Sequence, residues 1–428
     1  MLRIGLICLC ALSALYLIVR YSIPAGLSET GPEAALSLNA SYPGAVVGLA
    51  QQAISDEANR RAARKDKPGS ADTAPADLDA LKKALRAAIL KDPLNASAFQ
   101  LLAQIAQLEG NAKSARQMMT TAARLSIEDA TANAFMLQQS LLANNVGEAL
   151  RYADILMRGK TSLIGPVAQL VARMTEVPGA KQELVRRLGA APPWRAPVLG
   201  AFASSGLTNP QAPLGVLLAL KDTPNPPREK ELVGYINYLL QNKLYAFAYS
   251  SWLQFLPKDR LSQVAYLFNG SFEQQMSGVP FDWMIGSGSE VIAGVYARPD
   301  NADKRALFIS FGQMRGVFPT IRQMTVLRPG AYRFTGNING EMLARRGLQW
   351  RVTCVEGGLA GESQMLLGRF PKWASFQFDI VIPEDKCAAQ YVELVHMARS
   401  PSEQLATGSV WFDDLAIVRR ASVSKATP

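Results

Sequence analysis

The spacing of apolar residues changes near residue 258, and this change constrains the fold more than any other feature of the sequence. Between Leu78 and Lys258 apolar residues recur at the three- and four-residue spacing of helices. Beyond Lys258 they alternate with polar residues, as in strands that bury one face. The chain of 428 residues therefore predicts a helical domain at residues 78–260, an all-β domain at residues 262–420 and a short tail at residues 421–428.

The helical stretch repeats itself with a step of 34 residues, the period of a helix-turn-helix solenoid. Packing residues recur at this step, in a first unit with Phe99, Leu102, Ala103, Ala106, Gly110, Ala115, Met119 and Ala122 and a second with Met136, Leu137, Asn144, Ala149 and Ala153. Small residues at such positions allow two helices to approach closely. The pattern resembles tetratricopeptide repeats, and the resemblance implies a surface for a protein partner. The alternative is a generic α-helical domain with accidental self-similarity.

The amino terminus carries an uncharged, mostly apolar run. Met1–Arg3 form a positive cap, Ile4–Val19 form the run, and Arg20 closes it. No small-residue cleavage motif follows, so the run predicts a retained membrane anchor helix over residues 1–23, and the alternative is a cleaved signal peptide. We therefore expect a single-pass inner-membrane protein of a Gram-negative-type bacterium, with the bulk of the chain in the periplasm. Residues 24–77 are predicted to be a partly disordered linker, because their charged and Pro-rich end lacks a hydrophobic period.

The net charge of +10 limits the choice of partners. A basic excess suits anionic lipid headgroups, acidic polysaccharide or nucleic acid, because each presents dense negative charge. No long run of adjacent bases occurs, which favours a simple solubilising surface. We expect no nucleic-acid partner.

Two of the four cysteines, Cys354 and Cys387, fall in the predicted all-β domain. Their common location predicts a disulfide formed in an oxidising compartment, which agrees with export of this domain.

The alternation in the last domain assigns one face of each strand to a core. The residues predicted to point inward are Leu348, Trp350, Val352, Cys354, Phe376, Phe378, Ile380, Tyr332 and Phe334. Their neighbours Gln349, Arg351, Gln377 and Arg333 then point outward. Two such sheets packed face to face make a β-sandwich.

Three motifs of this domain resemble a known family. They are Leu-Phe-Asn-Gly-Ser-Phe-Glu at 267–273, Leu-Arg-Pro-Gly-Ala-Tyr-Arg-Phe at 327–334 and Gly-Ser-Val-Trp-Phe-Asp-Asp-Leu-Ala-Ile at 408–417. The set is similar to the strands of jelly-roll carbohydrate-binding modules of the families 4 and 9 type, which have a galactose-binding-like fold. This fold also carries modules that bind protein, so the resemblance implies the fold more firmly than a ligand.

The same resemblance implies a structural calcium ion between the first and last strands, with Glu273 and either Asp413 or Asp414 as ligands. Carboxylate oxygens from distant strands suit calcium chemically. The alternative is that these carboxylates bond backbone amides at strand ends.

Sugar recognition requires aromatic faces and planar hydrogen-bonding side chains. The predicted glycan-binding residues are Trp283, Arg333, Gln349, Arg351, Gln377 and Tyr391. The alternative for Trp283 is packing over the end of the sandwich, and the arginines can equally form a solvated face.

These features predict an adaptor rather than an enzyme. Its helical repeats would bind a protein and its sandwich a polysaccharide or oligosaccharide, in support of exopolysaccharide or envelope polysaccharide production. The chain contains a single histidine, His396, which leaves little for histidine-dependent catalysis. The alternatives are a purely protein-binding scaffold with a structural sandwich and, less favoured, a glycoside-active enzyme that uses Asp379 and Glu393.

Overall fold

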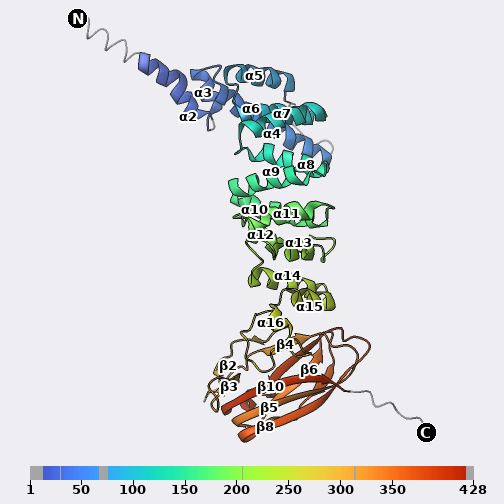
Figure 1. Ribbon diagram of the computed structural model, residues 1–428. Coiled ribbons are helices and arrows are strands. Elements are labelled where there is room, and N and C mark those ends of the chain that lie inside the picture. The colour runs from blue at the N-terminus through green and yellow to red at the C-terminus, as the bar shows by residue number, and fades with distance from the viewer. Residues whose placement is uncertain (1–12, 29, 67–75, 205, 313–314, 421–428) are drawn as a thin grey trace. The chain divides into compact units, whose positions relative to one another are not determined.

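The computed structural model describes most of the chain, at residues 13–28, 30–66, 76–204, 206–312 and 315–420. The chain divides into two compact units, residues 1–174 and 175–428. Figure 1 shows the described residues of both units as a ribbon.

The first unit is helical. After a π-helical turn at Ile18–Ser22 its helices are α2 Ile23–Leu27, α3 Pro32–Leu38, α4 Pro43–Asp66, α5 Leu78–Lys91, α6 Ala96–Leu108, α7 Ala112–Leu125, α8 Ala130–Leu142, α9 Val146–Gly159 and α10 Thr161–Arg173. Helices α6 and α7 pack as a pair, as do α8 and α9. The first residues of α6 and α8 are 96 and 130, so the two pairs begin 34 residues apart.

Short polar side chains fix where these helices begin. Asn95, Asn111, Asp129 and Asn145 each precede a helix, and each side-chain oxygen accepts a hydrogen bond from a backbone N–H in the first turn. Such caps satisfy donors that the helix itself leaves without partners. The helical period predicted from the sequence is therefore visible in the structure, and the assignment to tetratricopeptide repeats stays a prediction.

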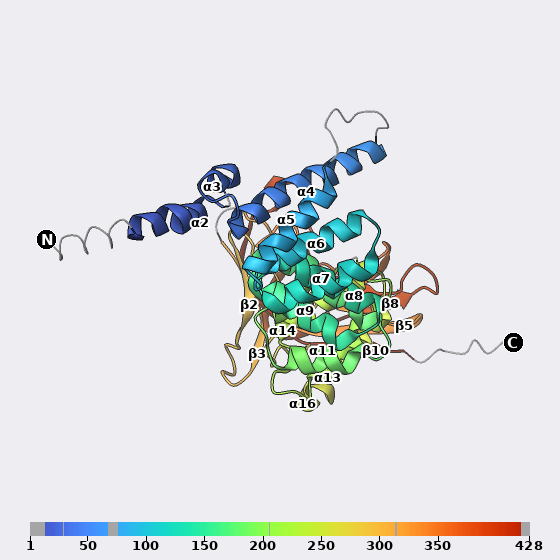
Figure 2. The same ribbon diagram turned by 90° about the horizontal axis from the view of Figure 1, so that it is seen from above.

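Helix α4 corrects the predicted linker at residues 24–77, much of which is helical. Ala50 and Ile54 of α4 are buried in one cluster with Leu85 and Leu101, where α4 packs along α5 and α6 (Figure 2). The sequence pattern concealed this helix because alanine buries little apolar surface and gives a weak period. Residues 67–75 of the predicted linker lie outside the described residues.

No helix in the described part of the chain is both long enough and apolar enough to span a bilayer. The predicted inner-membrane, single-pass localisation with a periplasmic bulk is therefore wrong. Residues 1–12 of the predicted anchor lie outside the described residues. The described remainder of the apolar run, Ser13–Val19, is too short because a spanning helix needs about 20 apolar residues.

The second unit begins with short helices. They are α11 Ala180–Gly189, α12 Arg195–Ala201, α13 Pro213–Leu220, α14 Glu229–Gln241, α15 Tyr245–Leu253 and α16 Lys258–Leu261, and a 3-10 turn at Met174–Glu176 leads into them. The buried guanidinium of Arg195 connects the end of α11 to the segment that precedes α14. It donates to the carbonyl oxygens of Leu188, Asn225 and Pro226 and pairs with Glu231 at 3.1 Å.

The rest of the second unit is a β-sandwich, which confirms the predicted all-β C-terminal domain. The strands are β1 Met284–Ile285, β2 Val291–Ala297, β3 Arg305–Phe311, β4 Ile321–Thr325, β5 Gly330–Ala344, β6 Leu348–Cys354, β7 Leu359–Glu362, β8 Gly368–Ile382, β9 Gln390–His396 and β10 Ala406–Arg419, with a 3-10 turn at Pro401–Glu403. The first sheet has the order β1-β4-β9-β6-β7, and the second sheet has the order β2-β3-β10-β5-β8 (Figure 1). The paired strands are antiparallel.

The core lies between the two sheets and contains the residues that alternation predicted. Trp350 of the first sheet stacks on Phe334 of the second at 5.7 Å between ring centroids and meets Phe412 edge to face at 5.6 Å. The predicted disulfide between Cys354 and Cys387 is present and joins the end of β6 to the segment before β9.

The opening motif and the closing strand meet at Gly270. The backbone N–H of Leu415 donates to the Gly270 carbonyl oxygen at 3.0 Å. A Cβ atom on Gly270 would lie 1.8 Å from the Leu415 carbonyl oxygen. Only glycine fits here, which gives a physical reason for the Asn-Gly-Ser turn of the opening motif.

We expect Arg195→Ala to lower the free energy of unfolding by about 3–5 kcal/mol, because it leaves the Glu231 carboxylate, which is only 13% exposed, without its cation. Urea unfolding followed by tryptophan fluorescence measures this change. Arg186→Ala is the control, since the Arg186 side chain is 65% exposed and should give no measurable change. An effect of Arg195→Ala as small as that of the control would contradict the structural role of this cation.

We expect Gly270→Ala to lower the free energy of unfolding by about 3 kcal/mol, because the added methyl group forces the turn away from β10. The same unfolding experiment applies. Gly200→Ala in α12 is the matched control, because nothing lies within 4 Å of its added Cβ and alanine favours a helix. Equal stability of the two variants would rule out the contact at Leu415.

Candidate functional site

The six predicted glycan-binding residues occupy three different places. Gln349, Arg351 and Tyr391 lie on the outer face of the first sheet, as the register of β6 and β9 requires. Arg333 and Gln377 lie on the outer face of the second sheet, on paired strands β5 and β8. The structure therefore does not bring the six residues together.

Trp283 lies in the core, where its side chain is 1% exposed. Its ring packs against Phe272 and Trp350, and its indole Nε1 donates to the Asn269 carbonyl oxygen at 3.0 Å. No face of this ring is open to a sugar. The packing role that the sequence left as an alternative is the one that the structure supports.

On the outer face of the first sheet the three predicted binding residues already contact other groups of the protein. Gln349 is buried, and its amide donates to the Ser363 carbonyl oxygen at 2.6 Å. Arg351 pairs with Glu362 at 3.2 Å. The guanidinium carbon of Arg322 lies 4.6 Å from the centre of the Tyr391 ring and covers one face of it. A ligand would have to displace these contacts.

A row of aromatic side chains crosses the outer face of the second sheet. Phe308 of β3 stands opposite Trp411 of β10, and their ring centroids are 4.4 Å apart. Tyr296 of β2 meets Phe308 edge to face at 5.7 Å and is 48% exposed. The predicted glycan-binding residues did not include any member of this row. The signal was available, because the inward position of Phe412 forces Trp411 outward.

Beside this row the second sheet has a polar recess of about 540 Å³. Its lining residues are Thr335, Gly336, Asn337, Ser375, Phe376, Gln377 and Asp414. The Ser375 hydroxyl donates to Asn337 Oδ1 at 2.8 Å, and the Asn337 amide donates to Asp414 at 3.1 Å. Gln377 is exposed, so its amide is accessible to a ligand.

A bulge in β10 aims Asp414 at this recess. The register of β10 against β5 shifts between Asp413 and Ala416, and Asp414 adopts a φ of 52°. Bulges commonly redirect a side chain beside a functional site. The neighbouring Asp413 is buried and accepts from the backbone N–H of Asp414 at 2.7 Å.

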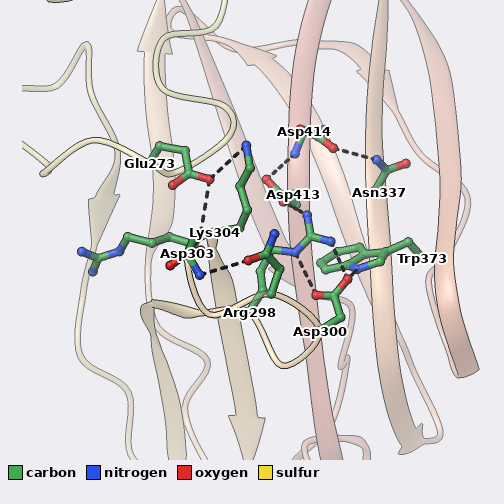
Figure 3. A network of polar contacts seen from close by, with 11 residues as sticks. Glu273, Arg298, Asp300, Asp303, Lys304, Asn337, Trp373, Asp413 and Asp414 are labelled. Atoms are coloured by element: carbon green, nitrogen blue, oxygen red, sulfur yellow. Dashed lines mark hydrogen bonds and ion pairs between the residues drawn. The ribbon is translucent and has the colours of Figure 1, made fainter.

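Trp373 of β8 lies beside the recess, within the polar network of Figure 3. Its indole Nε1 donates to Asp300 at 2.9 Å, and the guanidinium carbon of Arg298 lies 4.4 Å from its ring centre. Hydrogen bonding from Arg298 holds the pKa of Asp300 well below its usual range. Burial raises the pKa of Asp413, an effect that the Arg298 guanidinium partly opposes.

The predicted calcium ligands do not fit a calcium site. Glu273 faces Lys304 at 3.9 Å, Asp413 pairs with Arg298 at 2.7 Å, and Asp414 accepts from Asn337 (Figure 3). Across the described part of the chain no three metal-binding side chains cluster. Calcium requires six to eight converging oxygen donors, whereas two of these carboxylates are already paired with cations of the protein.

The two carboxylates considered for glycoside hydrolysis lie on opposite outer faces. Asp379 is on the second sheet beside Arg333, and Glu393 is on the first sheet opposite Arg351. The Arg333 guanidinium lowers the pKa of Asp379. Burial lowers the pKa of His396, whose Nε2 lies 3.0 Å from the Arg346 carbonyl oxygen. This arrangement assembles neither a carboxylate pair nor a histidine-based site.

The C-terminal strands thus form a β-sandwich of two antiparallel sheets. No protein-family model matches the chain, and no curated protein matches it.

Several solved structures are similar to the sandwich at low identity. A CBM4 carbohydrate-binding module is 14% identical, with 36% of this chain and 99% of that chain covered and a TM-score of 0.28. A putative sugar binding protein from Bacteroides thetaiotaomicron is 11% identical, with 37% and 100% covered and a TM-score of 0.27. A cyclase from Fischerella sp. is 12% identical, with 36% and 96% covered and a TM-score of 0.26. These likenesses assign no ligand to the chain.

We expect Trp283→Ala to lower the free energy of unfolding by about 3–5 kcal/mol, because truncation of a buried aromatic ring leaves a cavity. Urea unfolding measures the loss. Tyr296→Ala is the control, since that ring is 48% exposed and its removal leaves no enclosed cavity. Comparable stability of the two variants would show that Trp283 is not a core residue.

Proposed function

We propose that the outer face of the second sheet binds a glycan. The observation that carries the proposal is the combination of aromatic rings with a recess of amides, hydroxyls and a carboxylate. Trp373 and Trp411 supply flat apolar surface, and Gln377 with Asn337 supplies planar hydrogen-bonding groups. A sugar ring has apolar C–H faces and hydroxyl edges, so it needs both kinds of contact at once. Binding sites are generally lined in this way, by aromatic surface with a few placed polar groups.

Burial and partners favour this face over the outer face of the first sheet. Gln349 of the first sheet is buried and its amide is bonded to Ser363, whereas Tyr296 and Gln377 of the second sheet are exposed. The desolvation and rearrangement needed on the first sheet would cost binding free energy.

The charges on the second sheet favour a neutral glycan. Arg333 is paired with Asp379 and Arg369 with Glu341. Arg298 is paired with both Asp300 and Asp413. A uronate or phosphate group would have to compete with these carboxylates, so acidic polysaccharides should bind more weakly than neutral ones.

We extend the proposal to an adaptor whose helical unit binds a protein. In the first unit several large apolar side chains are exposed, among them Leu90 at 84% and Leu142 at 72%. Exposed apolar side chains of this size are a feature of interaction surfaces when they gather in a patch. The rival hypothesis is a scaffold with a purely structural sandwich, which predicts no glycan binding at all.

Affinity electrophoresis of the full chain against neutral and acidic polysaccharides tests the glycan proposal. We expect retardation by at least one neutral polymer, and a loss of affinity of about tenfold or more for Trp373→Ala, equivalent to about 1.4 kcal/mol. Gln377→Ala should weaken binding as well, because it removes the exposed amide of the recess.

Arg351→Ala is the matched control on the other sheet and should bind as the unaltered protein does. Retardation that Arg351→Ala abolishes and Trp373→Ala leaves unchanged would place the site on the first sheet. Absence of retardation by every polymer would support the scaffold.

A further inference from the structure

Arg298 lies just beyond the end of β2 and binds two carboxylates on separate segments. It forms a two-pronged pair with Asp300, at 3.0 Å from Nε and 2.7 Å from Nη2, and its Nη1 donates to Asp413 of β10 at 2.7 Å (Figure 3). One guanidinium therefore ties the β2–β3 loop to the central strand of the second sheet.

The same guanidinium fixes the orientation of Trp373. It covers one face of the indole, while Asp300 accepts the indole N–H at 2.9 Å. Rotation of the ring would break both contacts. Arg298 does not contact the opposite face of the ring. Trp373 lies two residues before Ser375, which lines the recess, so both side chains are on the same side of β8.

The burial of the Asp413 carboxylate explains why a cation is needed at this place. The side chain of Asp413 is only 3% exposed, and a buried carboxylate requires a positive partner or several donors. Asp413 receives Arg298 and the backbone N–H of Asp414. Glu273, the other predicted calcium ligand, lies near Lys304 and the backbone N–H of Arg305.

We propose that Arg298 takes the place that the family resemblance implied for calcium, as a built-in cation that locks β10 to the β2–β3 loop and orients Trp373 for a ligand. A guanidinium is planar and donates in several directions, so it can bind two carboxylates and stack on a ring simultaneously. Arg298 is thus a positioning residue. Its effect on Trp373 stands independently, and only the consequence for glycan affinity rests on the proposed function.

Fluorine NMR of the full chain labelled with 5-fluorotryptophan tests the orientation of Trp373 directly. The protein has six tryptophans, and Trp373→Phe identifies the resonance. We expect Arg298→Gln to shift and narrow that resonance, because the ring becomes mobile, and Arg298→Lys to do the same. Arg369→Gln is the control, since the Arg369 side chain is 71% exposed and pairs only with Glu341 in the described structure. An unchanged Trp373 resonance in Arg298→Gln overturns the proposal.

The double variant Arg298→Gln/Asp413→Asn controls for unfolding of the protein that an unpaired Asp413 could cause in the single variant. It removes the buried carboxylate charge together with the cation, and Asp413→Asn keeps the volume of that side chain. The Trp373 resonance should again shift and narrow, and an unchanged resonance counts against the proposal in this background too.

A metal titration tests the substitution of arginine for calcium. The full chain is dialysed against a chelator, and calcium is then added to millimolar concentration. We expect neither the melting temperature nor the Trp373 resonance to change. A saturable rise in melting temperature, with a shift of that resonance, would show that calcium occupies the position assigned to Arg298.

Glycan affinity provides a separate readout. Arg298→Gln should lose about tenfold in affinity, as Trp373→Ala does, and combining the two should cost little more than either alone, because both act through one ring. If Arg298→Gln bound the glycan with full affinity while Trp373→Ala did not, the positioning role of Arg298 would be overturned. If the unaltered protein binds no glycan, the proposed function fails, while the NMR and calcium results still decide the role of Arg298.

Discussion

The backbone contact between Gly270 and Leu415 is the constraint on which the sandwich depends. It brings the opening turn within hydrogen-bonding distance of the closing strand, at a point where any Cβ atom would collide. Strand β10 lies between β3 and β5 in the middle of the second sheet and pairs with both. Its alternation then sends Phe412 into the core and Trp411 to the outer face, and its bulge turns Asp414 toward the recess. The candidate site is a consequence of how this one strand is held.

The sequence predicted the inward and outward sides of the strands correctly, because side-chain alternation is a local property. Trp350 and Phe378 are core residues, and Gln349 and Gln377 lie on outer faces, as their spacing indicated. It did not reveal which residues share an outer face. Both sheets have the same period of two, and only the long-range pairing of β6 with β9 and of β5 with β8 separates the two faces. Trp283, outside any alternating strand, gave no periodic signal for its burial.

In the helical part, too, the sequence predicted features that depend on neighbouring residues and missed features that depend on tertiary packing. Caps such as Asn111 and Asn145 are local signals, and the helices after them begin where the period places them. Helix α4 was missed because its charged end resembles a linker. In the structure Glu57 is buried and binds Arg60 and Arg61, which lowers the pKa of Glu57 from 4.5 to about 2. The composition of this segment shows that it is highly charged, but it does not show that Glu57 is paired with two arginines of the same helix.

Side-chain footprinting with hydroxyl radicals, in the presence and absence of an oligosaccharide that retards the protein, shows which sheet binds the glycan. We expect the bound sugar to protect Trp373 and Trp411 of the second sheet and to leave Tyr391 of the first sheet as reactive as before. Protection of Tyr391, with Trp373 and Trp411 unaffected, would contradict it.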